Sequence, residues 1–374
     1  MVDEKITFIK LNIQQSIWSK LSQLKSNHRI ANAYLFSGSR GSGKEAIALK
    51  FATYVNCTAV DGPCGECASC RRFRFLQHEH LKLIVPMPRE VKSSGNADVA
   101  ALLDAIKIKA KNPFYKITLP KANTIPISHI RKLQRDLYLK SIQTGRKIVL
   151  IYDAHMLCTG DASSANAILK ILEEPPNNTT FILVTDYKAD LLPTILSRCQ
   201  CLDFPALKRD DVVAYLLSSG VEDYLAQFAA NIADGDMRRA LTLTDFGKND
   251  IMELVKTLRN LVSEEHVENW RSFNQNYSRT AKNNFYEFEF HLFLLQWWFK
   301  QAYLQRVGIN NSDVINGMST DLREFNANFP NANFDKINNI IEETIIAPRK
   351  NLYMRLILTN FLIGIQQSLD KSIY

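Results

Sequence analysis

Residues Gly38-Ser39-Arg40-Gly41-Ser42-Gly43-Lys44-Glu45 follow the phosphate-binding loop pattern G-x-x-x-x-G-K-[S/T] in all but the last position. In this pattern the glycines let backbone N–H groups turn inward around phosphate oxygens, and the lysine brings a positive charge to the β- and γ-phosphates. The final hydroxyl binds Mg²⁺, and this chain has Glu45 in its place. The sequence therefore predicts a loop built like that of an NTPase but without one part that an NTPase needs.

The segments around the loop predict an α/β sheet. Ala33–Ser37 is a short apolar run that ends at the loop, and Ser42–Asn56 has a helical pattern, so the loop joins a strand to a helix N-terminus. Three more strand candidates are Leu81–Val85, Lys147–Asp153 and Thr180–Thr185. Strands separated by helices in this way indicate a parallel sheet covered on both faces. After about residue 206 helical patterns take over, which predicts an α/β P-loop domain followed by all-α domains.

The third predicted strand ends at Asp153, after the apolar run Ile148–Tyr152. A carboxylate that ends a strand beside a phosphate loop is suited to hold Mg²⁺, which prefers oxygen ligands. An ordinary carboxylate at a strand end is the alternative, but the phosphate loop upstream favours the Mg²⁺ role.

Four cysteines, Cys57, Cys64, Cys67 and Cys70, have the spacing C-x6-C-x2-C-x2-C. Such short spacings let four thiolates converge on one tetrahedral Zn²⁺, and a full set of thiolates leaves no open position for catalysis. Disulfides are the alternative, but they seldom persist in the cytosol, where we expect this chain. The spacing therefore predicts a structural zinc site.

The composition is that of an ordinary globular protein. The chain has 374 residues, of which 46% are hydrophobic and 22% charged, enough for two or three domains with their own cores. We expect neither a signal peptide nor a membrane span, because no basic start precedes an apolar region and no long uncharged apolar run occurs. We therefore expect a cytoplasmic protein. The formal net charge of +8 is compatible with contact with nucleic acid but does not require it.

Positive charge is concentrated in residues 101–150, which hold eleven lysines and arginines against Asp104 and Asp136. Two interpretations stay open: a solvated helix face with a basic loop, or a surface that faces a phosphate backbone or an acidic partner. Few aromatic residues interleave with these charges, so base stacking is not indicated.

Arg198 follows a turn in the segment Thr185–Cys199. Most arginines at such turns form surface ion pairs. At the rim of a nucleotide-binding sheet, however, an arginine can reach the γ-phosphate bound by a neighbouring subunit. Its planar fork there stabilises the charge that develops during phosphoryl transfer.

The order of these motifs resembles that of a known family. The series is Arg29–Phe36, the phosphate loop, the cysteine cluster, Ile148–His155, Asn166–Pro176 and Ser197–Cys199. Over residues 8–240 it is similar to the bacterial replicative clamp loaders, AAA+ assemblies that open sliding clamps for DNA polymerase III. The resemblance is specific because Leu172-Glu-Glu-Pro-Pro176 and Ser197-Arg-Cys199 rarely occur together elsewhere. Gly235–Leu241 also resembles the lid motif of the family, whose arginine, here Arg238, senses nucleotide.

The resemblance implies two candidate subunit types. Motor subunits, called gamma or tau, carry Lys-Thr in the loop and Asp-Glu on the third strand, whereas this chain has Glu45 and Ala154. The delta-prime subunit commonly lacks a working ATP site but keeps the Ser-Arg-Cys arginine, which acts in trans on the adjacent motor subunit. Both departures favour a delta-prime-type, largely non-hydrolysing stator. An active gamma/tau-like motor ATPase and a stand-alone DNA-binding AAA+ scaffold are the alternatives.

Site residues and partners also come from the resemblance. Arg198 would be an arginine finger acting in trans. The vestigial nucleotide-binding residues would be Gly38, Gly41, Gly43, Lys44, Asp153, Thr185 and Arg238. ATP and Mg²⁺ are expected at the neighbouring subunit's site rather than at this chain's own, and Zn²⁺ is expected as a structural ion. The implied partners are the gamma/tau and delta subunits and, through the complex, the sliding clamp and primer–template DNA.

Two stretches in the C-terminal third are rich in apolar residues. Phe285–Tyr303 is dense in aromatic side chains, and Leu352–Ile365 is apolar nearly all round. Such helices either form an ordinary all-α core or pack against other chains, and the resemblance favours a helical collar that holds subunits in a ring. The expected domains are an AAA+ domain at 1–206 with its zinc module at 57–70, a helical lid at 207–248 and a collar at 249–374.

The chain departs from the family pattern in two places. The first gap between cysteines is shorter than expected. Residues 89–123 look like an insertion before a helix at Ile127–Lys140, and the role of this insertion is left open.

Overall fold

The structure is a computed structural model, and it describes residues 8–59, 62–88, 95–139, 144–263, 267–309, 318–350 and 352–369. Contacts divide the chain into two compact units. The first consists of Met1–Ala226 with Ala233–Leu241, and the second of Gln227–Ile232 with Thr242–Tyr374. Helices α9 (Asp223–Ala233) and α10 (Met237–Phe246) therefore contribute residues to both units. The three-domain division at residues 206 and 248 stays a prediction.

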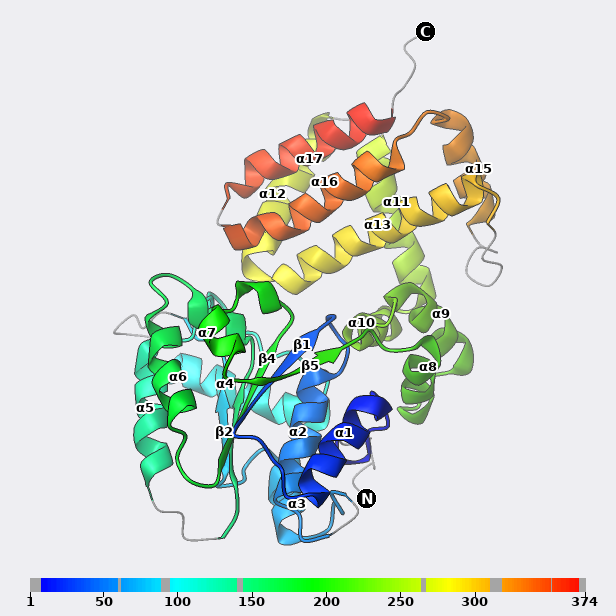
Figure 1. Cartoon of the computed structure of the whole chain (residues 1–374). Coiled ribbons are helices and arrows are strands. Elements are labelled where there is room, and N and C mark those ends of the chain that lie inside the picture. The colour runs from blue at the N-terminus through cyan, green and yellow to red at the C-terminus, as the bar shows by residue number, and fades with distance from the viewer. Residues whose placement is uncertain are drawn as a thin grey trace. The chain divides into compact units, whose positions relative to one another are not determined.

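A five-stranded sheet runs through the first unit in the order β2-β3-β4-β1-β5 (Figure 1). The strands are β1 (Ala33–Gly38), β2 (Leu81–Ile84), β3 (Lys147–Ile151), β4 (Thr179–Thr185) and β5 (Gln200–Phe204). All four pairings between them are parallel, so the carboxyl ends of the strands lie at one edge of the sheet. In this register Ser37 pairs with Thr185, which places the end of β4 beside the start of the phosphate loop.

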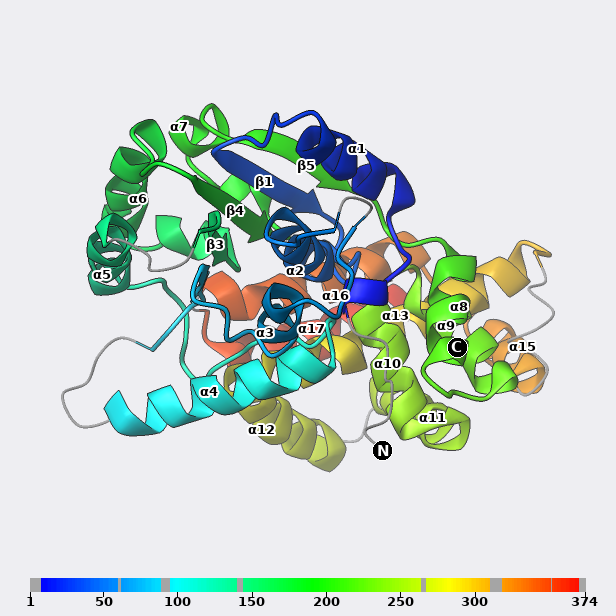
Figure 2. The same ribbon diagram turned by 90° about the horizontal axis from the view of Figure 1, so that it is seen from below.

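Helices cover both faces of the sheet (Figure 2). On one face α5 (Ile127–Tyr138) and α6 (Ser163–Glu173) bury a hydrophobic cluster. Its members include Ile130, Leu133, Ile168 and Ile171 from the helices and Leu35, Val149 and Phe181 from the strands. On the other face lies α2 (Lys44–Val55), whose Phe51 ring meets the Tyr34 ring edge-on with centroids 5.7 Å apart. Successive side chains of a strand thus pack on opposite faces of the sheet, as expected for a strand buried on both sides.

The first unit contains further helical elements. They are η1 (Phe8–Lys10), α1 (Gln15–Ser26), α3 (Ala68–Arg74), α4 (Gly95–Lys111), η2 (Ala154–Cys158), η3 (Lys188–Asp190), α7 (Pro193–Leu196) and α8 (Arg209–Ser218). The predicted helix Ser42–Asn56 is α2, which begins two residues later because Gly43 has a left-handed φ of 83° that ends the loop. The helix predicted at Ile127–Lys140 is α5, and Lys140 lies outside the described residues.

Strand β5 is missing from the sequence prediction, which names four strands. It is an edge strand, and only its last residue, Phe204, is buried. The sequence Gln200-Cys-Leu-Asp-Phe204 therefore has no apolar run of the kind that marks the four inner or better covered strands.

An isolated antiparallel β-bridge, outside the sheet, joins the two ends of the predicted insertion. Met87 and Thr124 lie just outside residues 89–123, and the Met87 N–H donates to the Thr124 carbonyl at 2.9 Å. Within the insertion, α4 is followed by a segment that buries Phe114 and Ile117 in the first unit. Residues 89–94 lie outside the described part of the chain.

The second unit is helical in its described residues. It contains α11 (Lys248–Ser263), α12 (Val267–Asn283), α13 (Phe285–Arg306), α15 (Ser319–Asn328), α16 (Phe334–Ile346), η4 (Ala347–Lys350) and α17 (Met354–Leu369). The aromatic stretch predicted at Phe285–Tyr303 is α13, which packs against α11, α12, α15 and α16. Its Trp298 is fully buried and meets Phe325 edge-on at 4.7 Å, so these aromatics form a core within the unit.

A parallel sheet covered by helices, carrying a phosphate loop and followed by a mostly helical C-terminal region, confirms the predicted fold class. No helix within the described ranges is both long enough and apolar enough to cross a membrane.

Candidate functional site

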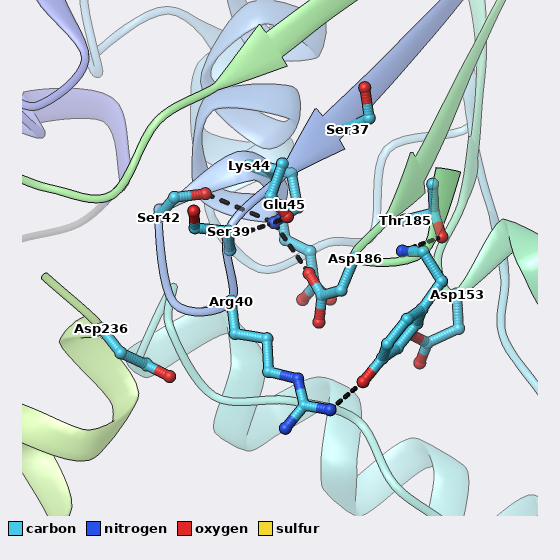
Figure 3. Close-up of polar contacts among 12 residues, drawn as sticks. Ser37, Ser39, Arg40, Ser42, Lys44, Glu45, Asp153, Thr185, Asp186 and Asp236 are labelled. Carbon is cyan, nitrogen blue, oxygen red and sulfur yellow. Dashed lines mark hydrogen bonds and ion pairs between the residues drawn. The ribbon is translucent and has the colours of Figure 1, made fainter. Parts of the chain in front are cut away.

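The phosphate loop has the backbone that its sequence predicts. Gly38, Gly41 and Gly43 have φ values of 135°, 59° and 83°, a region that side chains rarely enter. A Cβ at Gly38 would also collide with the Phe204 carbonyl, and one at Gly41 with the Asp236 carboxylate. These glycines are therefore required by both conformation and space, and the loop leads directly into the N-terminus of α2 (Figure 3).

Lys44, the first residue of α2, is buried and turned back onto its own loop. Its Nζ donates to the carbonyls of Gly38 and Ser39 at 2.9 and 2.5 Å and to Ser42 Oγ at 3.3 Å. It also forms an ion pair with Asp186 Oδ1 at 2.7 Å, as drawn in Figure 3. The lysine that would contact phosphates is thus held by a carboxylate of the same chain.

Glu45, which replaces the Mg²⁺-binding hydroxyl, forms an ion pair with Lys109 of α4. The Lys109 side chain is 0% exposed, and its Nζ also donates to the Tyr115 carbonyl at 2.7 Å. Burial lowers the pKa of Lys109, and the neighbouring Glu45 carboxylate opposes that effect. The unfavourable carboxylate in the loop is therefore balanced by a lysine from the insertion.

Asp153, the predicted Mg²⁺ ligand, is also paired with a lysine of the insertion. Its carboxylate forms an ion pair with Lys116, whose Nζ lies 3.8 Å from Asp186 as well. Burial lowers the pKa of Lys116, but the carboxylates of Asp153 and Asp186 raise it by more. The net pKa is therefore raised, and the ammonium form is favoured. Ala154, where a motor would carry glutamate, is fully buried. As arranged, these residues do not fit a bound Mg²⁺ on Asp153.

Three cations converge on Asp186, which directly follows β4. Lys44 and Lys116 approach it as described, and Arg238 of α10 places Nη2 3.7 Å from Oδ2. Burial raises the pKa of the Asp186 carboxyl, but Lys116, Lys44 and Arg238 together hold it well below its usual range. The sequence prediction missed Asp186, although its position at the carboxyl end of a central strand was a usable signal.

Thr185 lies at the same strand end and is buried. Its Oγ1 lies 3.0 Å from His155 Nδ1 and accepts a 3.0 Å hydrogen bond from the Tyr187 N–H. The structure thus brings together all seven residues predicted for the nucleotide site, together with Asp186, Lys109 and Lys116, which the prediction did not include.

Arg198 lies elsewhere on the first unit, between α7 and β5. Its side chain is 33% exposed and forms an ion pair with Glu173 Oε1 at 2.6 Å. Its Nη1 also donates to the Thr194 carbonyl at 2.9 Å. Glu173 ends α6, so the Leu-Glu-Glu-Pro-Pro and Ser-Arg-Cys segments meet through this contact. The guanidinium is oriented by its own chain but remains accessible from outside.

The four predicted zinc ligands converge. The Sγ atoms of Cys57, Cys64, Cys67 and Cys70 all lie within 4.8 Å of one another. The 3.6 Å between Cys57 and Cys64 is far beyond the ~2.05 Å of a disulfide, and all four are free thiols. Backbone N–H groups donate to three of the sulfurs, those of Cys57, Cys64 and Cys67, at 3.4 Å. This donor set fits a tetrahedral Zn²⁺.

The basic residues of 101–150 do not share one surface. Lys109 and Lys116 turn inward to the loop, while Lys107 and Lys111 are exposed. Arg146 donates to Thr180 Oγ1 at 2.6 Å, and this contact holds the start of β4. Part of this charge is therefore internal to the fold, which neither of the two interpretations anticipated.

Fold and site together define a protein of the P-loop class, with Glu45 in place of the Mg²⁺-binding hydroxyl of the loop. A protein-family model described as "DNA polymerase III, delta subunit" matches residues 13–208, more than half of the chain. The chain therefore belongs to this family.

Individual relatives carry several names. The DNA polymerase III subunit tau of Bacillus subtilis is 32% identical over 240 residues, covering 62% of this chain and 36% of that protein. The subunit delta' of the same organism is 27% identical over 223 residues, covering 59% and 56%. This chain thus matches only about a third to a half of the length of these relatives. A solved gamma subunit-related protein of Thermotoga maritima covers 93% of this chain and 99% of its own, with 19% identity and a TM-score of 0.43.

Proposed function

We propose that this chain is the delta-prime-type subunit of a bacterial DNA polymerase III clamp loader, a stator that hydrolyses little or no ATP itself. In this role it would join gamma/tau and delta subunits in a hetero-oligomer and act on the sliding clamp and primer–template DNA through that complex. It would be a component of a DNA polymerase holoenzyme without being its ATPase. The observation that supports this most is the replacement of two catalytic positions by Glu45 and Ala154 in a loop that is otherwise complete.

The site geometry supports the absence of hydrolysis. A hydrolytic site needs Mg²⁺ on the loop hydroxyl and on the strand-end carboxylate. Here Glu45 supplies no hydroxyl, and the Asp153 carboxylate pairs with Lys116. The buried Ala154 carries no group that could orient an attacking water.

Arg198 is the proposed contribution to catalysis, as an arginine finger at the neighbouring subunit's ATP site. Its contacts with Glu173 and the Thr194 carbonyl hold the guanidinium in one orientation, and a third of the side chain remains exposed. A planar guanidinium fixed in this way stabilises the charge that develops on transferred phosphoryl oxygens.

The test is DNA-stimulated ATP hydrolysis by the reconstituted complex with Arg198→Ala. Loss of an arginine finger slows the affected site by about 10³–10⁵. ATP hydrolysis at the shared site should therefore become undetectable, while sites that this chain does not contact should hydrolyse ATP at the wild-type rate. Arg209→Ala is the matched control, because Arg209 is exposed, lies on α8 and is paired with Asp210. Unchanged hydrolysis at every site with Arg198→Ala would remove the proposed role.

A motor ATPase is the second candidate, because tau of Bacillus subtilis matches this chain at 32% identity and delta' of the same organism at 27%. A motor would require turnover by the isolated chain that Lys44→Ala abolishes. The stator requires no turnover that depends on Lys44. This measurement separates the two candidates without any partner subunit.

The rest of the chain takes supporting roles in this proposal. Residues 1–206 would form the AAA+ domain, with Zn²⁺ on the four cysteines as a structural ion. Residues 207–248 would form the lid that carries Arg238, and residues 249–374 the collar that packs against other subunits.

A further inference from the structure

We infer that residues 95–123 act as an internal plug of the phosphate loop, in which Lys109 and Lys116 replace the bound cation and exclude Mg²⁺–ATP. A plug does more than prevent hydrolysis, because it gives the insertion a role and prevents Mg²⁺–ATP from binding to the loop at all. It concerns this chain's own loop and is independent of Arg198.

The first support is charge matching. Lys109 pairs with Glu45 at the position of the Mg²⁺-binding hydroxyl, and Lys116 pairs with Asp153 at the strand end. In this chain Glu45 and Asp153 occupy the two positions that hold Mg²⁺ in a P-loop site, and each pairs with an ammonium group from the same inserted segment. A divalent cation could reach them only if these lysines left.

Lys44 completes the arrangement from the loop side. Its ammonium contacts Asp186 at 2.7 Å and two loop carbonyls, and Asp186 also receives Lys116 and Arg238. A triphosphate would have to compete with Asp186 for the same cations. The contacts that ordinarily bind phosphate are therefore satisfied within the chain.

The second support is that the plug is anchored by packing. Phe114 lies between the two lysines in sequence, is buried, and meets the Tyr215 ring edge-on at 4.9 Å. A Cβ at Gly43 would lie 3.4 Å from the Phe114 ring, so this side chain packs directly against the loop. Ile117 is also buried, and the Met87–Thr124 bridge ties the base of the insertion together. Opening the plug would expose these apolar groups, which distinguishes it from a loosely held lid.

The third support is the space that remains. The cavity over the loop is lined by Lys109, Phe114, Lys116, Asp186, Arg238 and loop residues, and its volume is about 30 Å³. This is room for about two water molecules. Pockets that hold ligands the size of a nucleotide measure about 300–1,000 Å³.

The experiment measures Mg²⁺–ATP binding by the full chain, using a slowly hydrolysed ATP analogue in calorimetry. The unplugged variant is Glu45→Thr/Lys109→Met/Lys116→Ala. It restores the loop hydroxyl, removes Lys109 together with its partner Glu45, and frees the Asp153 carboxylate from Lys116. The control is Lys107→Ala/Lys111→Ala, which removes two lysines of the same helix but keeps the Glu45–Lys109 and Lys116–Asp153 pairs; Lys107 is 72% exposed and pairs with the exposed Asp104.

We expect the wild-type chain and the control to show no Lys44-dependent binding at about 1 mM nucleotide, a concentration that half-fills even a millimolar site. The unplugged variant should bind at least about 10-fold more tightly than that limit. Lys44-dependent binding by the wild-type chain would overturn the inference. So would a folded unplugged variant that fails to bind, since the lysines would then not be what excludes nucleotide.

Hydrogen exchange on the wild-type chain keeps the test decisive if the unplugged variant does not fold. A plug predicts that amides of residues 109–117 and of the loop exchange at the same rates with and without Mg²⁺–ATP. A ligand-dependent change in these rates would show that nucleotide enters, and the inference would fail. Neither outcome bears on Arg198, whose role is read from the assembled complex.

Discussion

Asp186 is the residue on which the closed state of the loop depends. Its carboxylate is the common partner of Lys44, Lys116 and Arg238, so it links the loop, the insertion and α10. A carboxylate buried among three cations is stabilised in its ionised form, and removing it leaves those cations without their shared partner. At the scale of one residue, Asp186 should therefore matter more for stability than Asp153.

We predict that Asp186→Asn lowers the free energy of unfolding at neutral pH by about 3–5 kcal/mol, the usual cost of breaking a buried ion pair from one side. Because the folded-state pKa of Asp186 is lowered, its contribution is complete above the unfolded value of about 3.9 and is lost as pH falls through the folded value. The difference between wild type and variant should therefore narrow below about pH 4.

Urea unfolding at a series of pH values measures this difference. The matched control is Asp210→Asn, since Asp210 is 95% exposed and its ion pair with Arg209 is 3.8 Å long. Its effect should be small at every pH. A stability difference for Asp186→Asn that stayed constant from neutral to acid pH would contradict the assigned pKa shift.

Single residues also mark the limits of the sequence prediction at the site. The loop glycines and Lys44 were predictable because their roles follow from a local pattern, with no need to know the fold. The partners of Glu45 and Asp153 were not, because Lys109 lies 64 positions from Glu45 and Lys116 lies 37 from Asp153. Charged residues in a basic stretch are usually solvated, so composition alone predicted that these two lysines lie at the surface.

At the scale of elements, the cysteine cluster shows how a short helix is held. Cys67 is the N-cap of α3, and its Sγ accepts from the Cys70 N–H at 3.4 Å. The helix has only seven residues, too short to be stable on its own. A metal ion on the four sulfurs would therefore supply much of the stability of this module, on the order of 10 kcal/mol for sites of this type.

We predict about one Zn²⁺ per chain, lost in Cys64→Ser, which should also lower the melting temperature and expose the 57–70 region to proteolysis. Cys201→Ser is the control, because Cys201 is likewise an exposed, free cysteine but lies on β5, outside the cluster. Elemental analysis of the purified proteins reads the metal content directly. Wild-type protein free of zinc after purification in zinc-supplemented medium would argue against the site.

The sequence predicted the inner strands of the sheet but missed the edge strand β5, because the inner strands are buried and β5 is largely exposed. Strands β1, β3 and β4 lie inside the sheet and read as continuous apolar runs, so their positions agree with the prediction within about two residues. Strand β5 pairs on one side only and is largely exposed, and its sequence carries no such signal. The insertion was visible as a departure from a family pattern, but its function depends on where the fold places Lys109 and Lys116.

At the scale of the whole molecule, the two apolar stretches of the C-terminal region behave differently. Helix α13 is buried among α11, α12, α15 and α16, which agrees with an ordinary all-α core. Helix α17 buries Leu358, Phe361 and Leu362 on one side. It leaves Leu356 and Ile363 exposed on another, so packing against other chains stays a prediction for that face of α17. Periodicity could not separate the two interpretations, since α17 is apolar nearly all round.

The exposed face of α17 is the surface that the collar proposal requires. Leu356 and Ile363, two helical turns apart, are 56% and 41% exposed, and Tyr353, just before the helix begins, is 68% exposed. We predict that Leu356→Asp/Ile363→Asp leaves the chain folded, because substitutions at exposed positions usually change stability by less than about 0.5 kcal/mol. The same change should weaken assembly with the gamma/tau and delta subunits by at least about 10-fold, since a charge would be buried at the interface.

Leu217→Asp on α8, equally exposed at 41%, is the control for a charge placed elsewhere. Gel filtration with the partner subunits reads assembly, and circular dichroism reads folding. If the double variant assembled like the wild-type chain, α17 would not be the collar surface, and its apolar face would need another partner.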